Sequence, residues 1–186
     1  MARVSVIDPK TATGEAAALL NAVQAQLGIT PNFIRVLANS PKALEGFLGL
    51  YGAAAGFAVD KATQERIALA VAEGNGCQYC VSAHTAIGRH AGLSNEEMAL
   101  NRRGSSSDAK AAGAVAFAKA LNDHLGEVTS AEFDGARAAG LSDGEIVEII
   151  AIVALNIFTN VLGKATRVEI DFPKVELMRP ALEVIA

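Results

Sequence analysis

Most of the chain consists of apolar runs at helical spacing, separated by residues that start and stop helices. Ser, Thr and Asp side chains cap the free N–H groups at a helix start, and Gly commonly ends a helix. Thr30 and Ser40 each precede a proline, which the first helical turn tolerates, and Ser94 and Ser142 each precede a Glu at capping-box spacing. These signals predict helices over about residues 13–27, 31–38, 41–58, 61–73, 77–91, 108–125, 130–140 and 142–163, with a shorter helix after Ser94.

The composition agrees with close-packed helices, since 51% of residues are hydrophobic, only 5% are aromatic and there is no Trp. We therefore expect an all-α fold. The 186 residues suit a single domain, 1–186, that buries most of its apolar surface without disulfides. Residues 167–186 contain two prolines and no long helical period, so we expect an extended C-terminal tail that can wrap on a partner subunit.

Charge and hydropathy argue against several classes of partner. The net charge is −4 and no Lys or Arg run exceeds the pair Arg102-Arg103, so we expect no nucleic acid partner. The amino terminus lacks the apolar core of a signal peptide, which predicts a cytoplasmic protein. The most apolar segment, 149–162, contains Asn156, Thr159 and Asn160 and is shorter than the roughly 20 residues of a membrane span, so we expect a buried helix and no membrane association.

Both cysteines and one of the three histidines lie in the stretch "GCQYCVSAH". Cys77 and Cys80 are i and i+3, so on a helix they share a face and can form a disulfide. His84 follows Cys80 by four residues, where it can take the proton of that thiol. A helix start at Cys77 would instead favour a thiolate on Cys77, so the residues alone support either cysteine as the nucleophile.

Two carboxylates compete as the partner of His84. If Gly74-Asn75-Gly76 folds the flanking helices into a hairpin, Glu65 lies about 14 Å before the break and His84 about 12 Å after it, so they meet side by side. Such a carboxylate would orient the imidazole as a base. Glu73 is nearer to Cys77, but we favour Glu65. The helix pair 60–94 is thus the candidate active site.

Other interpretations of this cluster are weaker. Two buried apolar cysteines would explain the pair but not the nearby base and carboxylate. A zinc site lacks a fourth ligand, because His90 lies off the shared face, so we expect neither a metal nor another cofactor. His90 and His124 fit positions near helix ends, and Asn156 and Asn160 fit amides that hydrogen-bond between helices, with Asn156 as a further pocket candidate.

The spacing from Glu65 through Cys77-x-x-Cys80 to His84 resembles the active-site signature of alkylhydroperoxidase D-like proteins in the carboxymuconolactone decarboxylase superfamily. The strong resemblance covers about residues 60–94. It implies an all-helical homo-oligomer, a trimer or hexamer, with peroxiredoxin-type activity on hydrogen peroxide or organic hydroperoxides. By this resemblance Cys80 is the peroxidatic residue, Cys77 the resolving residue and His84 with Glu65 the proton relay. A dithiol reductant, lipoyl or thioredoxin-like, would restore the thiols.

Three further hypotheses follow. Family members can carry a histidine between the cysteines, where this chain has Gln78-Tyr79, so Tyr79 either binds a peroxide oxygen or packs at a subunit interface. Val71, Val81 and Ile87 are candidates for the lining of an organic hydroperoxide pocket. The alternative functions are a carboxymuconolactone decarboxylase-like lactone enzyme, which does not call for two redox cysteines, and a redox-sensing binding module.

Overall fold

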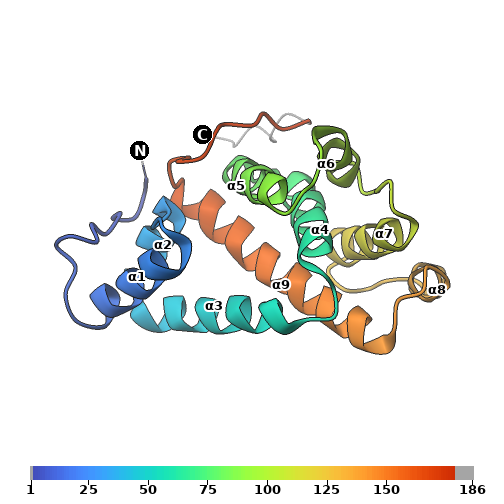
Figure 1. Cartoon of the computed structure of the whole chain (residues 1–186), viewed down its shortest axis with the longest axis horizontal. Helices are drawn as coiled ribbons and strands as arrows, with labels where there is room; N and C mark the ends of the chain where they lie inside the picture. Colours follow the sequence, from blue (N-terminus) through green and yellow to red (C-terminus); the bar gives the residue numbers. More distant parts are fainter. Residues whose placement is uncertain (1, 179–186) are drawn as a thin grey trace.

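The computed structural model describes residues 2–178, and the regular elements within that range are all helical (Figure 1). The helices are α1 (Gly14–Leu27), α2 (Asn32–Leu37), α3 (Pro41–Ala53), α4 (Lys61–Gly74), α5 (Gln78–His90), α6 (Asn95–Arg102), α7 (Ala109–Asp123), α8 (Ser130–Ala138) and α9 (Asp143–Thr166), and a 3₁₀ turn, η1 (Ala54–Gly56), follows α3. The predicted all-α fold is confirmed.

Helix α4 occupies the centre of the fold. It packs against α5, α6, α7 and α9, and Ile67, Leu69 and Val71 on it are fully buried. One apolar cluster joins α4 to α7 and α9, and a second joins α1 and α2 to α5 and the chain after α9. Figure 1 shows α9 running diagonally between α3 and the α4–α5 pair. The α4–α5 pair therefore lies where the two clusters adjoin.

Helix α9 differs from its predicted extent. It continues through Gly163 to Thr166, so the predicted end at Gly163 is wrong. Among the helices described, α9 is also the one whose length and composition would allow it to cross a membrane. It packs against α3, α4, α5 and α7, however, and Asn156 and Asn160 on it are buried. One face of α9 is therefore buried as predicted, while apolar residues such as Val147 and Val161 are exposed on the other face, where the prediction of a buried helix is wrong.

Most of the predicted helices begin with a side-chain cap. The side chains of Ser40, Asp60, Ser94, Asp108, Thr129 and Ser142 each accept a backbone N–H in the first turn of the helix that they precede. Thr30 is an exception, because its hydroxyl donates to Gln24 and the residue that precedes α2, Pro31, has no side chain that can cap it. The capping box at Ser94 lacks its second half, since the buried Glu97 carboxylate binds Arg66 instead. The helix predicted over 41–58 ends at Ala53.

The chain that follows α9 packs against earlier parts of the same chain. Residues 167–178 form no regular element, as expected of the extended tail, and residues 179–186 lie outside the described range. The guanidinium of Arg102 donates to the carbonyl of Glu176 (2.6 Å), and the Met178 N–H donates to the Glu73 carboxylate (2.7 Å). We call residues 168–178 the C-terminal segment.

Candidate active site

The two helices of the site are joined by a tight reversal at Asn75-Gly76. Asp60 begins α4 by accepting the Thr63 N–H, and Gly76 has a φ of +63°, a left-handed conformation that favours glycine. The Cys77 N–H then donates back to the carbonyl of Ala72 (2.9 Å). This geometry makes Cys77 the N-cap of α5 and folds α5 against α4, as the glycine pattern predicts.

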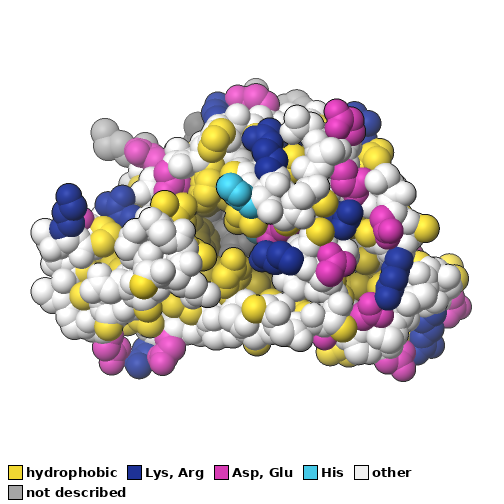
Figure 2. Space-filling view, viewed as in Figure 1, with side chains coloured by type: hydrophobic (Ala, Val, Ile, Leu, Met, Phe, Trp, Pro, Cys, Tyr) yellow, Lys and Arg dark blue, Asp and Glu magenta, His cyan; other side chains and the backbone are white. Residues whose placement is uncertain are grey.

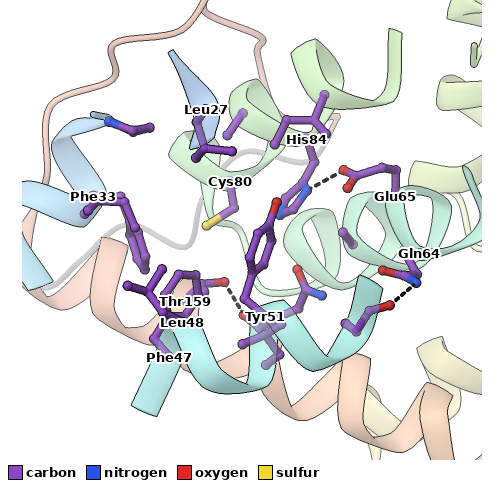
Figure 3. A pocket seen from close by; sticks show the side chains of 18 of the residues that line it. Leu27, Phe33, Phe47, Leu48, Tyr51, Gln64, Glu65, Cys80, His84 and Thr159 are labelled. Carbon is purple, nitrogen blue, oxygen red and sulfur yellow. Dashed lines mark hydrogen bonds and ion pairs between the residues drawn. The ribbon is translucent and has the colours of Figure 1, made fainter. Parts of the chain in front are cut away.

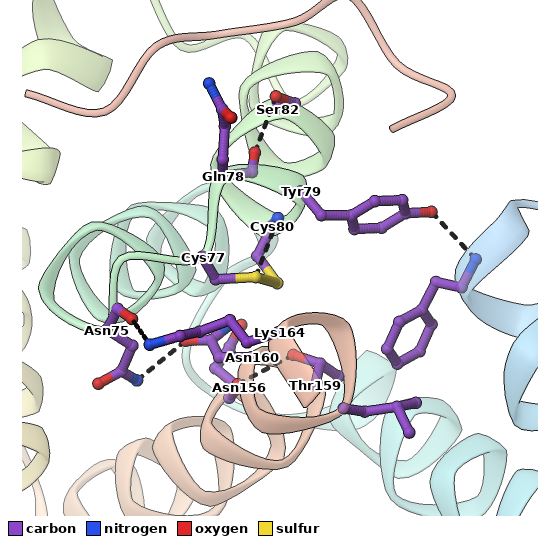
Figure 4. The surroundings of a disulfide bond; sticks show 12 residues. Asn75, Cys77, Gln78, Tyr79, Cys80, Ser82, Asn156, Thr159, Asn160 and Lys164 are labelled. Carbon is purple, nitrogen blue, oxygen red and sulfur yellow. Dashed lines mark hydrogen bonds between the residues drawn. A yellow bond between two sulfur atoms is a disulfide. The ribbon is translucent and has the colours of Figure 1, made fainter. Parts of the chain in front are cut away.

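Cys77 and Cys80 form a disulfide in this structure, with Cα atoms 5.3 Å apart (Figure 4). Both are buried, at 1% and 3% exposure. The Cys80 N–H donates to the sulfur of Cys77, the contact by which a helix start stabilises a thiolate. Gly163 of α9 lies behind the pair, where a Cβ would be 3.5 Å from the Cys77 sulfur. Gly163 thus faces the disulfide across an ordinary van der Waals distance.

Glu65 meets His84 across the helix pair, as predicted. The His84 Nδ1 atom lies 2.7 Å from the Glu65 Oε2 atom. The other carboxylate oxygen, Oε1, lies 3.1 Å from the Lys61 ammonium, one turn earlier on α4. Burial alone would raise the pKa of Glu65, but the charges of His84 and Lys61 and their hydrogen bonds hold that pKa below its usual value of 4.5. Glu65 is thus an ionised carboxylate that can orient the His84 ring.

Lys61 also contacts the ring of Tyr51. The Lys61 ammonium lies 5.4 Å from the centre of the Tyr51 ring, a cation–π contact. Partial burial opposes the charge of Lys61, but the Glu65 carboxylate and Tyr51 raise the pKa of Lys61 above its ordinary value. Lys61 therefore remains a cation beside the carboxylate. Its spacing from Glu65, i to i+4, was visible in the sequence but was not predicted to matter.

A cavity of about 160 Å³ opens beside this pair. Figure 2 shows the hollow, with hydrophobic side chains around it and a histidine at its rim. Cys80 and His84 both line the cavity, and in Figure 3 the Cys80 sulfur points into it. Cys77 is absent from the lining. The rest of the lining is largely apolar and aromatic, and includes Phe33, Ile34, Phe47, Leu48, Tyr51, Tyr79, Ile87, Leu155 and Phe172.

Other predicted residues fall inside and outside this cavity. Of Val71, Val81 and Ile87, Ile87 alone lines it, because the other two are fully buried in helix packing. Asn156 lines the cavity as predicted, but the hydrogen bond between helices predicted for it is wrong, because its amide donates to the carbonyl of Ile152 on its own helix. Asn160 instead accepts from the side chain of Asn75, the interhelical bond expected of it (Figure 4).

The rival carboxylate and the remaining histidines take no part. Glu73 binds the Arg102 guanidinium (2.7 Å) and the Met178 N–H, which directs it away from His84. His90 is exposed in the last turn of α5, and His124 follows α7, as predicted. Across residues 2–178, no group of three His, Cys, Asp or Glu side chains could hold a metal ion.

Tyr79 is buried within its own chain. Its hydroxyl accepts the Phe33 N–H (3.2 Å) and donates to a carboxylate oxygen of Asp171 (2.9 Å). Burial raises the pKa of Tyr79, so the hydroxyl remains a donor. Phe33 and Phe172 were not predicted as cavity residues, because they come from distant parts of the chain and carry no local motif.

Residues 41–123 match the carboxymuconolactone decarboxylase family, a range that contains the whole α4–α5 site. This match supports the resemblance to the carboxymuconolactone decarboxylase superfamily that the signature from Glu65 to His84 implied. No curated protein matches the chain significantly.

Solved structures of three proteins share the fold of this chain over almost their whole length. The alkylhydroperoxidase AhpD core of a peroxidase-related protein from Ralstonia eutropha JMP134 is 24% identical, with a TM-score of 0.78 over 91% of this chain and 92% of that one. A peroxidase-related protein from Silicibacter sp. TM1040 is 24% identical, with a TM-score of 0.76 over 89% and 91%. The debrominase Bmp8, solved in complex with 2,3,4-tribromopyrrole, is 21% identical, with a TM-score of 0.75 over 92% and 94%.

Proposed function

We propose that this protein is a thiol peroxidase that reduces hydroperoxides through a cycle of its Cys77–Cys80 dithiol and disulfide. One observation carries the proposal: Cys80 lines the same cavity as His84, which is held by Glu65, while Cys77 is bonded to Cys80 from the side away from the cavity. This arrangement provides a nucleophile, a base, an orienting carboxylate and a resolving thiol.

The cycle starts from the two free thiols. His84 accepts the Cys80 thiol proton, and the thiolate attacks the terminal oxygen of the hydroperoxide. The O–O bond breaks, the leaving alkoxide takes the proton from His84, and Cys80 becomes a sulfenic acid. The Cys77 thiol then attacks the Cys80 sulfur and releases water, which forms the disulfide. The hydroperoxide has gained two electrons and leaves as an alcohol.

The cavity supports an organic hydroperoxide as the preferred substrate. A volume of about 160 Å³ exceeds the needs of hydrogen peroxide, and the lining is mostly apolar. An alkyl or aryl group would displace water from this surface and gain binding energy that hydrogen peroxide cannot. We expect kcat/KM for cumene hydroperoxide to exceed that for hydrogen peroxide.

The burial of the disulfide supports a slender reductant. The nucleophilic thiol must reach a sulfur atom, and both sulfurs belong to residues that are at most 3% exposed. A lipoyl-type dithiol on a flexible arm can enter the cavity and attack Cys80, whereas a folded thioredoxin-like protein needs a disulfide near the surface. We therefore favour a lipoyl reductant, and a cytoplasmic location where such dithiols are kept reduced.

Reductive dehalogenation is a second candidate. The debrominase with a similar fold was solved with a brominated pyrrole, and the cavity here is rich in aromatic side chains that would stack on such a ring. A dithiol can supply the two electrons that replace a carbon–bromine bond by carbon–hydrogen, with bromide released. The lactone-enzyme alternative leaves the dithiol without a role.

Turnover by matched variants tests the proposal. Wild type, Cys80→Ser, His84→Gln and His90→Gln are mixed with dihydrolipoamide and cumene hydroperoxide, and peroxide consumption is followed. We expect Cys80→Ser to abolish turnover and His84→Gln to reduce it by about 10²-fold or more. His90→Gln removes an exposed histidine of the same helix and should match wild type.

Other results would favour the alternatives. Full activity in Cys80→Ser contradicts the peroxidase assignment. Oxidation of wild type by peroxide without turnover by any dithiol would favour the redox-sensing module. Release of bromide from 2,3,4-tribromopyrrole faster than peroxide consumption would favour the dehalogenase.

We also propose that the protein is a homo-oligomer. Val147, Ile150, Phe158 and Val161 are all exposed on α9, at spacings of three and eight residues that place them on one face of the helix. A second copy of the chain would cover this apolar face.

A further inference from the structure

Tyr79, between the two cysteines, connects three separate parts of the chain. It belongs to the first turn of α5, its hydroxyl accepts the N–H of Phe33 in α2, and it donates to Asp171 in the C-terminal segment. Its ring lies 5.8 Å from the ring of Phe172, edge-on, and 6.2 Å from that of Phe33. Figure 4 shows the side chain reaching from the redox helix to α2.

Asp171 completes this connection. One carboxylate oxygen accepts the Tyr79 hydroxyl, and the other accepts the N–H of Asn32 (2.7 Å), the first residue of α2. The Asn32 side chain in turn donates to the carbonyl of Glu169 (3.2 Å). A single carboxylate therefore ties the C-terminal segment to both α2 and the residue next to Cys80. We call the Tyr79 hydroxyl and the Asp171 carboxylate the latch.

The latch holds the side chains that form one wall of the cavity. Phe33, Tyr79 and Phe172 all line the cavity together with Cys80. Phe33 follows Asn32, whose N–H binds Asp171, and Phe172 follows Asp171 itself. The hydrogen bonds of the latch therefore fix the positions of the Phe33 and Phe172 rings. We propose that Tyr79 and Asp171 are positioning residues that set the width of the cavity and thereby select bulky organic hydroperoxides over hydrogen peroxide.

This inference rests on the proposed peroxidase function and assigns its specificity. Hydrogen peroxide needs only a path to Cys80, whereas a bulky substrate uses the wall to place its terminal oxygen on the sulfur. Loss of the latch should consequently weaken the reaction of the bulky substrate alone. A purely structural role for Tyr79 would instead affect both substrates equally.

Two single-hydroxyl deletions on α5 separate these cases. Tyr79→Phe removes the latch hydroxyl. Ser82→Ala removes a hydroxyl that accepts the Val175 N–H (3.0 Å), so it loosens the same C-terminal segment without touching the cavity. We measure kcat/KM for cumene hydroperoxide and for hydrogen peroxide with dihydrolipoamide as the reductant.

The expected result is a change of preference. Tyr79→Phe and Asp171→Ala should each lower the ratio of the two kcat/KM values by about tenfold, and the double variant no further, because both break one unit. Ser82→Ala should keep the wild-type ratio. Phe172→Ala leaves both latch bonds in place and should lower the ratio because the wall itself loses a ring. This variant tests the role of the wall if a latch variant does not fold.

An unchanged ratio in Tyr79→Phe, or an equal change in Ser82→Ala, would overturn the assignment. If wild type consumes neither peroxide, the proposed function is wrong. The role of the latch in shaping the cavity is then tested by the binding of a dye. The apolar dye N-phenyl-1-naphthylamine should then fluoresce in the wild-type cavity and bind Tyr79→Phe about tenfold more weakly, with Ser82→Ala unaffected. Equal binding by all three proteins would reject the latch.

Discussion

At Glu65, the two carboxylate oxygens contact different side chains, the His84 ring on one side and the Lys61 ammonium on the other. The side chain is buried, so its ionisation depends on these two neighbours. Because Lys61 is about half exposed, water screens part of its effect. Lys61 therefore supports the ionised form of Glu65, while His84 is left available to the cavity.

Replacing Lys61 should make the protein less resistant to acid. The folded-state pKa of Glu65 is below its unfolded value, so Glu65 contributes stability above pH 4.5 that is lost as the pH falls through the folded pKa. Lys61→Met removes one cause of the lowering, so we expect the acid unfolding transition to move up by at most about one pH unit. Circular dichroism during acid titration measures the pH of this unfolding transition.

Lys61→Arg is the control, since it keeps a cation at this place and should titrate like wild type. An acid transition in Lys61→Met that coincides with that of wild type would mean that Lys61 does not support the charge of Glu65.

Two glycines of the site should respond oppositely to alanine. Gly76 has a positive φ, so Gly76→Ala should destabilise the protein by about 1 kcal/mol or more. Gly163 is helical, and a Cβ there would meet the Cys77 sulfur at 3.5 Å, an ordinary contact. Gly163→Ala should therefore be neutral or stabilise by up to about 1 kcal/mol. Urea unfolding of both variants measures this, and destabilisation by Gly163→Ala would show that the close approach of α9 needs the bare glycine.

At the scale of helices, local signals predicted the α4–α5 hairpin well. Asp60, Gly76 and the i, i+3 and i+7 spacings of Cys77, Cys80 and His84 act within one or two turns, so their geometry follows from the sequence. The contact of Glu65 with His84 followed from their similar distances to the break. Helix capping and hairpin geometry are short-range effects, which explains this success.

The cavity could not be predicted in the same way. Its walls combine Phe33, Phe47 and Phe172, which approach each other only through tertiary packing. Gly163 was taken for a helix end because a glycine that stops a helix and a glycine that permits close packing look alike in sequence. The position of the C-terminal segment could not be predicted because its apolar residues pack on distant helices and isolated hydrogen bonds, such as those of Asp171, tie it to them.

The capping box of α9 should show a defined pH dependence. Glu145 binds the Lys110 ammonium and the Ser142 N–H, and these bonds, that with Lys110 above all, lower the pKa of Glu145 from 4.5 to about 2. Its charge therefore stabilises the fold above pH 4.5, and this stabilisation is lost as the pH falls toward about 2. Glu145→Gln should be less stable than wild type by about 1 kcal/mol near neutral pH. This difference should vanish as the pH approaches about 2.

Urea unfolding of both proteins at several pH values measures this difference. Glu148→Gln gives a comparison on the same helix, where the carboxylate binds the N–H groups of Ala58 and Val59 instead. A stability difference for Glu145→Gln that stays constant with pH would contradict the assignment of the effect to the Glu145 charge.

At the scale of the whole molecule, the exposed apolar face of α9 is the feature that the described chain leaves uncovered. Val147 and Val161 are 64% and 62% exposed and lie near opposite ends of the helix. If this face joins copies of the chain, Val161→Glu should lower the mass measured by light scattering after gel filtration, because a buried charge is costly. Leu125→Glu changes an apolar residue that is 86% exposed but lies outside α9, and it should leave the mass unchanged. A wild-type protein that is monomeric at micromolar concentration would contradict the proposed assembly.

The identity of the attacking sulfur tests the central claim most directly. The helix start favours a thiolate on Cys77, but Cys80 is the cysteine that lines the cavity with His84. Reduced Cys77→Ser is treated with one equivalent of cumene hydroperoxide, trapped with a sulfenate-specific reagent and analysed by peptide mass spectrometry. We predict a trapped sulfenate on Cys80, and none on Cys77 when Cys80→Ser is treated in the same way. A sulfenate on Cys77 in Cys80→Ser, with Cys80 unmodified in Cys77→Ser, would contradict the account.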